Sequence, residues 1–183
     1  MDKPFQPQIN AQDLLSPGSS FSAPPDLQAR ADAGGPEAQN NLGVLYASGG
    51  AFPQDFQAAA RCYRKAAEQG HALAQTNLAR MCAAGQGQPL DEAEARKWFR
   101  RAAHQGDAGA QFHLGLRLHR LSLQASATAG YEAKVEAFMW LQLAANQGFH
   151  KAESACGQLN LQMSNQEIGE AKRRVAAFVA TRE

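Results

Sequence analysis

The sequence is poor in the features that define several common classes of protein. It has only 3 cysteines among 183 residues, and an odd, sparse count is not a disulfide framework. No apolar run approaches the roughly 18 residues of a membrane span. Charged residues make up 19% and the net charge is +1, so no basic surface for nucleic acid or anionic lipid is evident. We therefore expect neither nucleic-acid nor membrane partners.

The beginning of the chain also lacks a recognisable targeting signal. Residues Met1–Gln6 do not show the charged-then-apolar pattern of a signal peptide. We expect a cytoplasmic protein, although a chain from which an export signal had been removed would look the same. Residues 1–24 contain four prolines with many Ser and Gln and no helical period, which predicts a flexible tail. Its apolar residues could dock into a groove of the folded part; they are Leu14, Leu15 and Phe21.

An internal repeat organises the rest of the chain. The segments KAAEQG, RAAHQG and LAANQG end at Gly70, Gly106 and Gly148, which are 36 and 42 residues apart. Ala-Gln pairs recur in the same phase at residues 38–39, 74–75 and 110–111. Apolar residues at helical spacing on both sides of a loop predict a helix, a loop and a second helix in each unit. Several signatures in one phase indicate a true structural repeat.

The phase of the repeat predicts the boundaries of the folded part, residues 25–183. The third repeat contains six extra residues, which fall within Leu121–Gly130. We expect its first helix to run longer and Ser126–Gly130 to break it. Ser164 and Glu167 have the spacing of a capping box. The predicted order is a cap helix at 25–34, repeats at 36–70, 71–106 and 107–148, a half repeat at 149–163 and a C-terminal cap helix at 164–181.

Small residues recur in the middle of each first helix. A mid-helix glycine costs about 1 kcal/mol relative to alanine, so a repeated cost at one position implies a repeated gain. We expect the gain to be a close approach of the paired helix at all four positions, which are Gly43, Ala79, Gly115 and Gly157.

The segments AQNNLGVLY (residues 38–46) and YRKAAEQG (residues 63–70) resemble the Sel-1-like repeat (SLR) family, a relative of the tetratricopeptide (TPR) repeats. The resemblance covers about residues 26–160. It implies an all-α fold, a right-handed α/α superhelix (solenoid) of about 3.5 helix-pair repeats with capping helices at both ends and a concave inner face. Members of the family typically act as protein-binding scaffolds or adaptors, which implies a non-catalytic role.

The repeat register also bears on the cysteines and histidines, the residues that most often act as nucleophiles or metal ligands. Cys62, Cys82 and Cys156 occupy positions that carry Trp98, Tyr46 and Leu42 in other repeats, so we expect three buried structural thiols. None of the five histidines pairs with a cysteine or carboxylate at metal-ligand spacing; they are His71, His104, His113, His119 and His150. We therefore expect no metal, no cofactor and no catalytic residue.

Polar and apolar residues at non-core positions of the first helices are candidates for a binding surface. If these helices line the concave side, asparagines could bond a peptide backbone, an arginine could meet an acid and two large apolar residues could hold an apolar anchor. The alternative is ordinary surface with second-layer packing. The candidates are Asn40, Asn41, Val44, Thr76, Asn77, Arg80, Phe112, His113 and Leu116.

These patterns leave three hypotheses about function. The first is an adaptor, a monomer or weak homodimer, that binds a peptide segment or partner domain on its concave face. The second is a structural protein that self-associates through the apolar inner face or the third-repeat insertion. The third and most remote is an enzyme or small-molecule binder.

Overall fold

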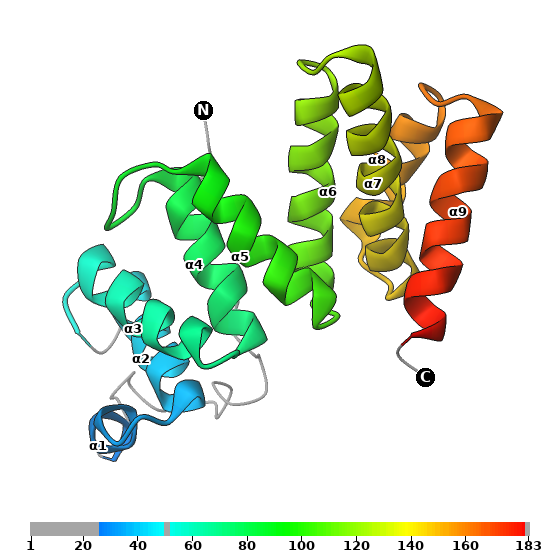
Figure 1. Ribbon diagram of the computed structural model, residues 1–183. Helices are drawn as coiled ribbons and strands as arrows, with labels where there is room; N and C mark the ends of the chain where they lie inside the picture. Colours follow the sequence, from blue (N-terminus) through cyan, green and yellow to red (C-terminus); the bar gives the residue numbers. More distant parts are fainter. Residues whose placement is uncertain (1–25, 50–51, 182–183) are drawn as a thin grey trace. The chain divides into compact units, whose positions relative to one another are not determined.

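The computed structural model describes residues 26–49 and 52–181, and every element in these residues is a helix (Figure 1). The expected all-α fold class is confirmed. The predicted tail and its docking residues lie outside the described residues. The helices are α1 (Leu27–Asp32), α2 (Pro36–Ser48), α3 (Phe56–Glu68), α4 (Ala72–Ala84), α5 (Glu92–His104), α6 (Ala108–Ser122), α7 (Ala127–Asn146), α8 (His150–Asn160) and α9 (Asn165–Ala180).

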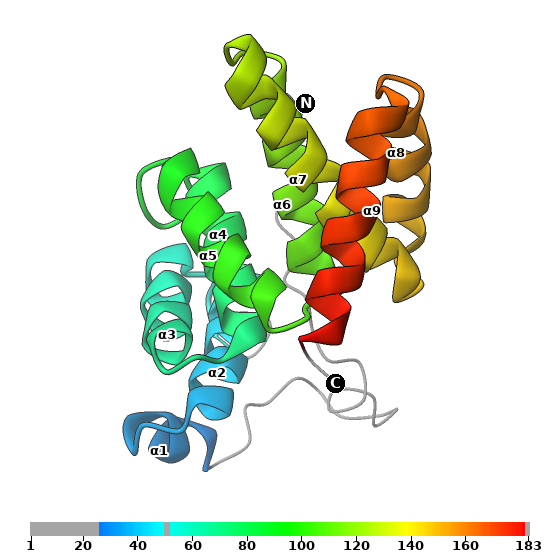
Figure 2. The same ribbon diagram turned by 45° about the vertical axis from the view of Figure 1, so that its right-hand side comes forward.

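The chain divides into two compact units, Met1–Arg101 and Ala102–Glu183, with the boundary inside α5. In the first unit α2 packs against both α1 and α3, and α3 packs against α4 (Figures 1 and 2). In the second unit α7 packs against α6, α8 and α9. Most of these contacts join helices that follow one another in the sequence, as helix-pair repeats require, whereas α9 packs against α7.

The helix ends are set by local hydrogen-bond chemistry. Asp55 accepts a hydrogen bond from the backbone N–H of Ala58 at 2.9 Å, and Asp107 caps α6 in the same way. The predicted capping box at the start of α9 is confirmed: Ser164 and Glu167 exchange side-chain to backbone hydrogen bonds of 2.7 and 3.3 Å. Gly49 ends α2 with φ of 73°, a left-handed conformation that glycine adopts without a Cβ penalty.

The glutamines of the Ala-Gln signature connect consecutive repeats. Their side-chain amides donate to the backbone carbonyl of an alanine that lies eight residues earlier, in the preceding second helix. The pairs are Gln39 with Ala31, Gln75 with Ala67 and Gln111 with Ala103, at 3.1, 3.0 and 3.2 Å. All three glutamines are buried. The Ala-Gln and Ala-Ala signatures therefore recur in one phase because they are the two sides of one contact.

Two of the small mid-helix residues permit the expected close approach. A Cβ on Gly43 would lie 2.7 Å from Cε1 of Tyr63, and one on Gly115 would lie 2.7 Å from Cγ of Leu141. The expectation is wrong for Gly157, because no atom lies within 4 Å of its Cβ position. Gly157 is exposed on α8, and the helix that follows, α9, packs against α7.

The third-repeat insertion lengthens helices rather than a loop. Helices α6 and α7 contain 15 and 20 residues, whereas α2 and α3 contain 13 each. The first helix does end before Ser126, but the expected break at Ser126–Gly130 is shorter than predicted: Ser126 is the N-cap of α7, and residues 127–130 form its first turn because alanine favours helix. Gly130 is buried inside α7, where a Cβ would lie 3.0 Å from the carbonyl oxygen of Ser122.

The three cysteines are free, and two of them are buried as expected. Cys82 and Cys156 lie in the interior, and burial raises the pKa of the Cys82 thiol to about 11. The expectation of burial is wrong for Cys62, which is only half-buried. The short α1, at six residues, covers less of its neighbours than the 13-residue α3 does.

Candidate functional site

The predicted inner-face residues are distributed over both units. Six of them lie on α2 and α4 in the first unit, and three lie on α6 in the second. Four of the six in the first unit are buried: Asn40, Val44, Thr76 and Asn77. For these four residues, burial supports packing between helices rather than a binding surface, because a buried side chain presents no surface to a partner.

Hydrogen bonds explain why polar residues are tolerated at these buried positions. Asn77 Nδ2 donates to Asn40 Oδ1 at 3.3 Å, from one repeat to the next. Thr76 Oγ1 donates to the carbonyl of Ala72 at 3.2 Å. Buried polar groups are stable only when they are paired in this way. Asn40 and Asn77 therefore stabilise the junction between α2 and α4.

Asn41 and Arg80 are the predicted residues of the first unit that reach the surface. Asn41 is exposed, and its Oδ1 accepts a hydrogen bond from Asn40 Nδ2 at 3.4 Å. Arg80 is half-buried, and burial lowers its pKa while the phenol of Tyr63 raises it. Tyr63 is fully buried, and its hydroxyl has no hydrogen-bond partner among the described residues. Arginine remains charged in proteins, so the first unit presents an amide on α2 and a cation on α4.

The second unit presents an apolar row along α6 and its C-cap residue, Leu123. Leu116 is 38% exposed and Leu123, two turns further along, is 68% exposed. Phe112 and His113 are half-buried one turn before Leu116. The ring of Phe112 lies 5.1 Å from the ring of Phe149, centroid to centroid, so Phe149 covers part of it. The expected open position of Phe112 is corrected to a partly covered one, which leaves Leu116 as the accessible end of this pair.

Phe149 and Leu123 are residues of this surface that the sequence interpretation missed. Phe149 stands in the register position of His71 and Asp107, the residues that cap α4 and α6. An aromatic residue at a capping position was the signal that could have revealed it. Leu123 lies in the third-repeat insertion, and its exposure depends on how α6 ends.

The second unit also contains a groove of about 360 Å³ at the ends of α7 and α9. Gln111 and Gln147 line it, and the amide of Gln147 donates to Gln111 Oε1 at 2.8 Å. Phe178 forms its apolar wall and packs edge-on against Trp140, with ring centroids 5.2 Å apart. The side chains of Gln111 and Gln147 are thus already engaged with each other.

Neither a metal centre nor a membrane helix is found in the part of the chain that the structure describes. No group of three or more His, Cys, Asp or Glu residues converges there as metal ligands. None of the helices in those residues combines the length and apolar character needed to span a bilayer.

Comparison with known proteins places this geometry among helical repeat proteins. The profile of the family described as Sel1 repeat matches residues 36–71, 72–107 and 108–149. A crystal structure of a Sel1 repeat protein from Oxalobacter formigenes is similar, with 34% identity and a TM-score of 0.60 over 73% of this chain and 96% of that chain.

A second solved structure is a protective antigen present in uropathogenic Escherichia coli strains that displays an SLR fold. It is 25% identical with a TM-score of 0.53, and the match covers 86% of this chain and 40% of that chain. Comparison with curated proteins gives no significant match.

Proposed function

We propose that this chain, which belongs to the Sel1 repeat family, is a non-catalytic scaffold that binds a peptide segment or domain of a partner protein. The family generally mediates protein–protein interaction. The observation that carries the proposal is the exposed apolar row along α6, where Leu116 faces solvent one turn after the half-buried Phe112 and Leu123 faces solvent at the C-cap.

An apolar row of this kind is suited to an apolar anchor of a partner. Burial of apolar surface contributes about 25 cal/mol per Å², and a few well-packed side chains carry most of the energy of an interface. Phe112, already held by Phe149, would form a rigid floor, and Leu116 would make the direct contact. A partner segment with one large apolar side chain fits this surface.

The first unit would contribute polar contacts to the same partner or to another one. Asn41 is exposed and could bond a peptide backbone, and the Arg80 guanidinium suits an acidic side chain. His113 adds a polar group beside the apolar row on α6.

A matched pair of leucine variants tests the proposal. Leu116→Asp should weaken binding of the partner at least tenfold, which corresponds to about 1.4 kcal/mol. Leu161→Asp is the control, because Leu161 is 87% exposed on the end of α8. Partners would be identified by affinity capture from the native host, and their affinities measured with purified proteins. Unchanged binding by the Leu116→Asp variant would place the site elsewhere.

The exposed leucines also favour one alternative, which is self-association through α6. Sedimentation velocity over a range of protein concentrations distinguishes the two functions. A dimer that Leu116→Asp abolishes would assign the apolar row to a second copy. A strict monomer at all concentrations would exclude the alternative.

We also propose a cytoplasmic location. The three free cysteines, two of them buried, fit a reducing compartment. Fractionation of the native host with an antibody against the chain tests this, and recovery of the protein outside the cytoplasm would contradict it.

A further inference from the structure

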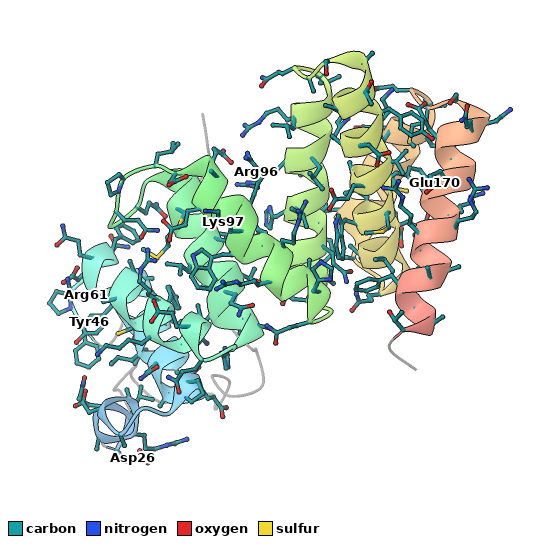
Figure 3. All side chains as sticks on the ribbon, in the orientation of Figure 1. Asp26, Tyr46, Arg61, Arg96, Lys97 and Glu170 are labelled. Carbon is teal, nitrogen blue, oxygen red and sulfur yellow. The ribbon has the colours of Figure 1, made fainter. Side chains whose placement is uncertain are left out.

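The first unit contains a groove of about 180 Å³ between α1 and α3, over the surface of α2. Figure 3 shows Tyr46 and Arg61 beside one another at this end of the unit. None of the residues predicted to form the inner face lines this groove. Its main lining residues are Gln28 and Asp32 of α1, Tyr46 of α2, and Arg61, Cys62 and Lys65 of α3.

The next repeat shows what normally occupies this space. Trp98 stands 36 residues after Cys62 and is only 7% exposed. Its indole N–H donates to Glu94 Oε1 at 3.2 Å. Glu94 also accepts a hydrogen bond of 2.7 Å from Arg64 on α3. An indole and an ion pair thus fill the junction between α3 and α5.

The first repeat lacks each of these groups. The residues in register with Arg64, Glu94 and Trp98 are Gln28, Ala58 and Cys62, all of which are smaller. The groove is therefore the space of a missing tryptophan ring and a missing ion pair. The side chains that line such a groove lack packing partners on one side. An aromatic side chain from another segment would therefore restore the packing contacts that Trp98 makes in the next repeat.

The walls of the groove suit an aromatic ring in particular. Arg101 lies 4.6 Å above the ring of Trp98, a cation–π contact. Lys65 stands in register with Arg101 and lines the groove. Tyr46 stacks on Phe52 with ring centroids 5.0 Å apart, which gives a second apolar wall. A ring in the groove would have a cation and an aromatic neighbour.

We propose that this groove is a binding site for an aromatic side chain, and that its occupant is Phe21 of the same chain. Phe21 lies outside the described residues, six positions before Leu27, the first residue of α1. An extended chain spans about 3.3–3.6 Å per residue, whereas a six-residue helix is about 9 Å long. Phe21 can therefore reach the part of the groove beside Gln28 and Asp32.

The prolines between Phe21 and α1 favour insertion of a side chain over a longer helix. A residue that precedes proline is disfavoured in the α region, and Pro24 and Pro25 directly precede Asp26, the N-cap of α1. These prolines therefore disfavour a backward extension of α1 along α3.

Alkylation of Cys62 in the full chain measures whether the groove is occupied. Cys62 lines the groove and is half-buried, whereas Cys82 and Cys156 are buried and serve as internal references. Iodoacetamide labelling would be quantified for each cysteine by peptide mass spectrometry. Phe21→Ala should raise the labelling rate of Cys62 at least threefold. Phe5→Ala, in the same segment, should leave it unchanged.

Three outcomes would overturn the proposal. Equal Cys62 rates in the wild-type and Phe21→Ala proteins would show that Phe21 does not cover the groove. Equal effects of Phe5→Ala and Phe21→Ala would show that no particular ring is bound. Protection of Cys62 that grows with protein concentration would assign the groove to a second copy.

A second variant tests the site without using thiol chemistry. Cys62→Trp should place in the groove the indole that Trp98 supplies in the next repeat. Phe21→Ala should then lower the melting temperature of the wild-type protein but not that of the Cys62→Trp protein. An equal decrease in both backgrounds would show that Phe21 acts elsewhere. The labelling experiment does not use the Cys62→Trp variant, so it still tests the proposal if that variant does not fold.

Discussion

The side-chain amide of Gln75 donates a hydrogen bond of 3.0 Å to the backbone carbonyl of Ala67, between the first helix of one repeat and the second helix of the preceding one. The same contact joins Gln39 to Ala31 and Gln111 to Ala103. A buried carbonyl that loses its donor costs about 1–3 kcal/mol. This contact therefore explains why two short signatures of the sequence recur in a constant phase.

Replacement of Gln75 by methionine should destabilise the protein by about 1–3 kcal/mol, because the buried Ala67 carbonyl loses its partner while the volume stays similar. The measurement is the free energy of unfolding from urea denaturation. Gln57→Met is the matched control, since Gln57 is exposed on α3. Equal stability of the two variants would show that the Gln75 contact is not a stabilising one.

The two mid-helix glycines of α2 and α8 should respond oppositely to alanine. Gly43→Ala should destabilise by about 1–3 kcal/mol through overpacking, because its Cβ would lie 2.7 Å from the buried ring of Tyr63. Gly157→Ala should be neutral or stabilise by up to about 1 kcal/mol, since alanine favours helix and the space is open. Urea denaturation measures both, and a Gly43→Ala protein as stable as wild type would contradict the close approach.

His71 should make stability depend on mildly acidic pH. Its Nδ1 accepts a hydrogen bond of 3.2 Å from the N–H of Ala74 at the start of α4, which requires a neutral ring. Burial lowers the His71 pKa below its ordinary 6.5, although Glu37 raises it. The unfolded chain therefore binds the proton first, and stability, complete above about pH 6.5, falls as the pH decreases below that value.

The His71→Asn variant is the control for this dependence, because asparagine is a good N-cap that does not titrate. Melting temperatures at pH 7.5 and 5.5 should differ more for the wild-type protein than for the variant. An equal decrease in both would assign the acid sensitivity to other groups.

Glu167 should contribute to the attachment of α9. Burial raises its pKa, but hydrogen bonds from Ser164 and Lys134 outweigh that effect and hold the pKa below its ordinary 4.5. Lys134 of α7 lies 3.1 Å from its carboxylate. This contribution is present above about pH 4.5 and is lost as the pH falls through the lowered pKa.

Glu167→Ala should therefore lower the free energy of unfolding at pH 7 by about 1–2 kcal/mol, the usual cost of a lost cap. Glu153→Ala is the matched control, since Glu153 is 57% exposed on α8. The difference between the two variants should shrink towards pH 3. A constant difference would show that the Glu167 charge is not involved.

Particular residues show how far the sequence could predict the site. The register identified Phe112 and Leu116 as large apolar residues at non-core positions, and the structure leaves Leu116 exposed. The sequence register could not show that Phe149 covers part of Phe112, because these two residues lie about one repeat length apart in the sequence. Nor could it separate Asn41, which is exposed, from Asn40, which is buried.

The sequence by itself determined the period, the helical character of each segment and most of the helix caps, since these depend on spacing and hydrogen bonds within a few residues. Only the tertiary structure decided which positions are covered by a neighbour. Cys62 and Trp98 share one register position, yet Cys62 remains half-exposed and Trp98 is buried. The physical reason is that burial depends on the side chains that the adjacent repeat supplies, and the first repeat has only the short α1 before it.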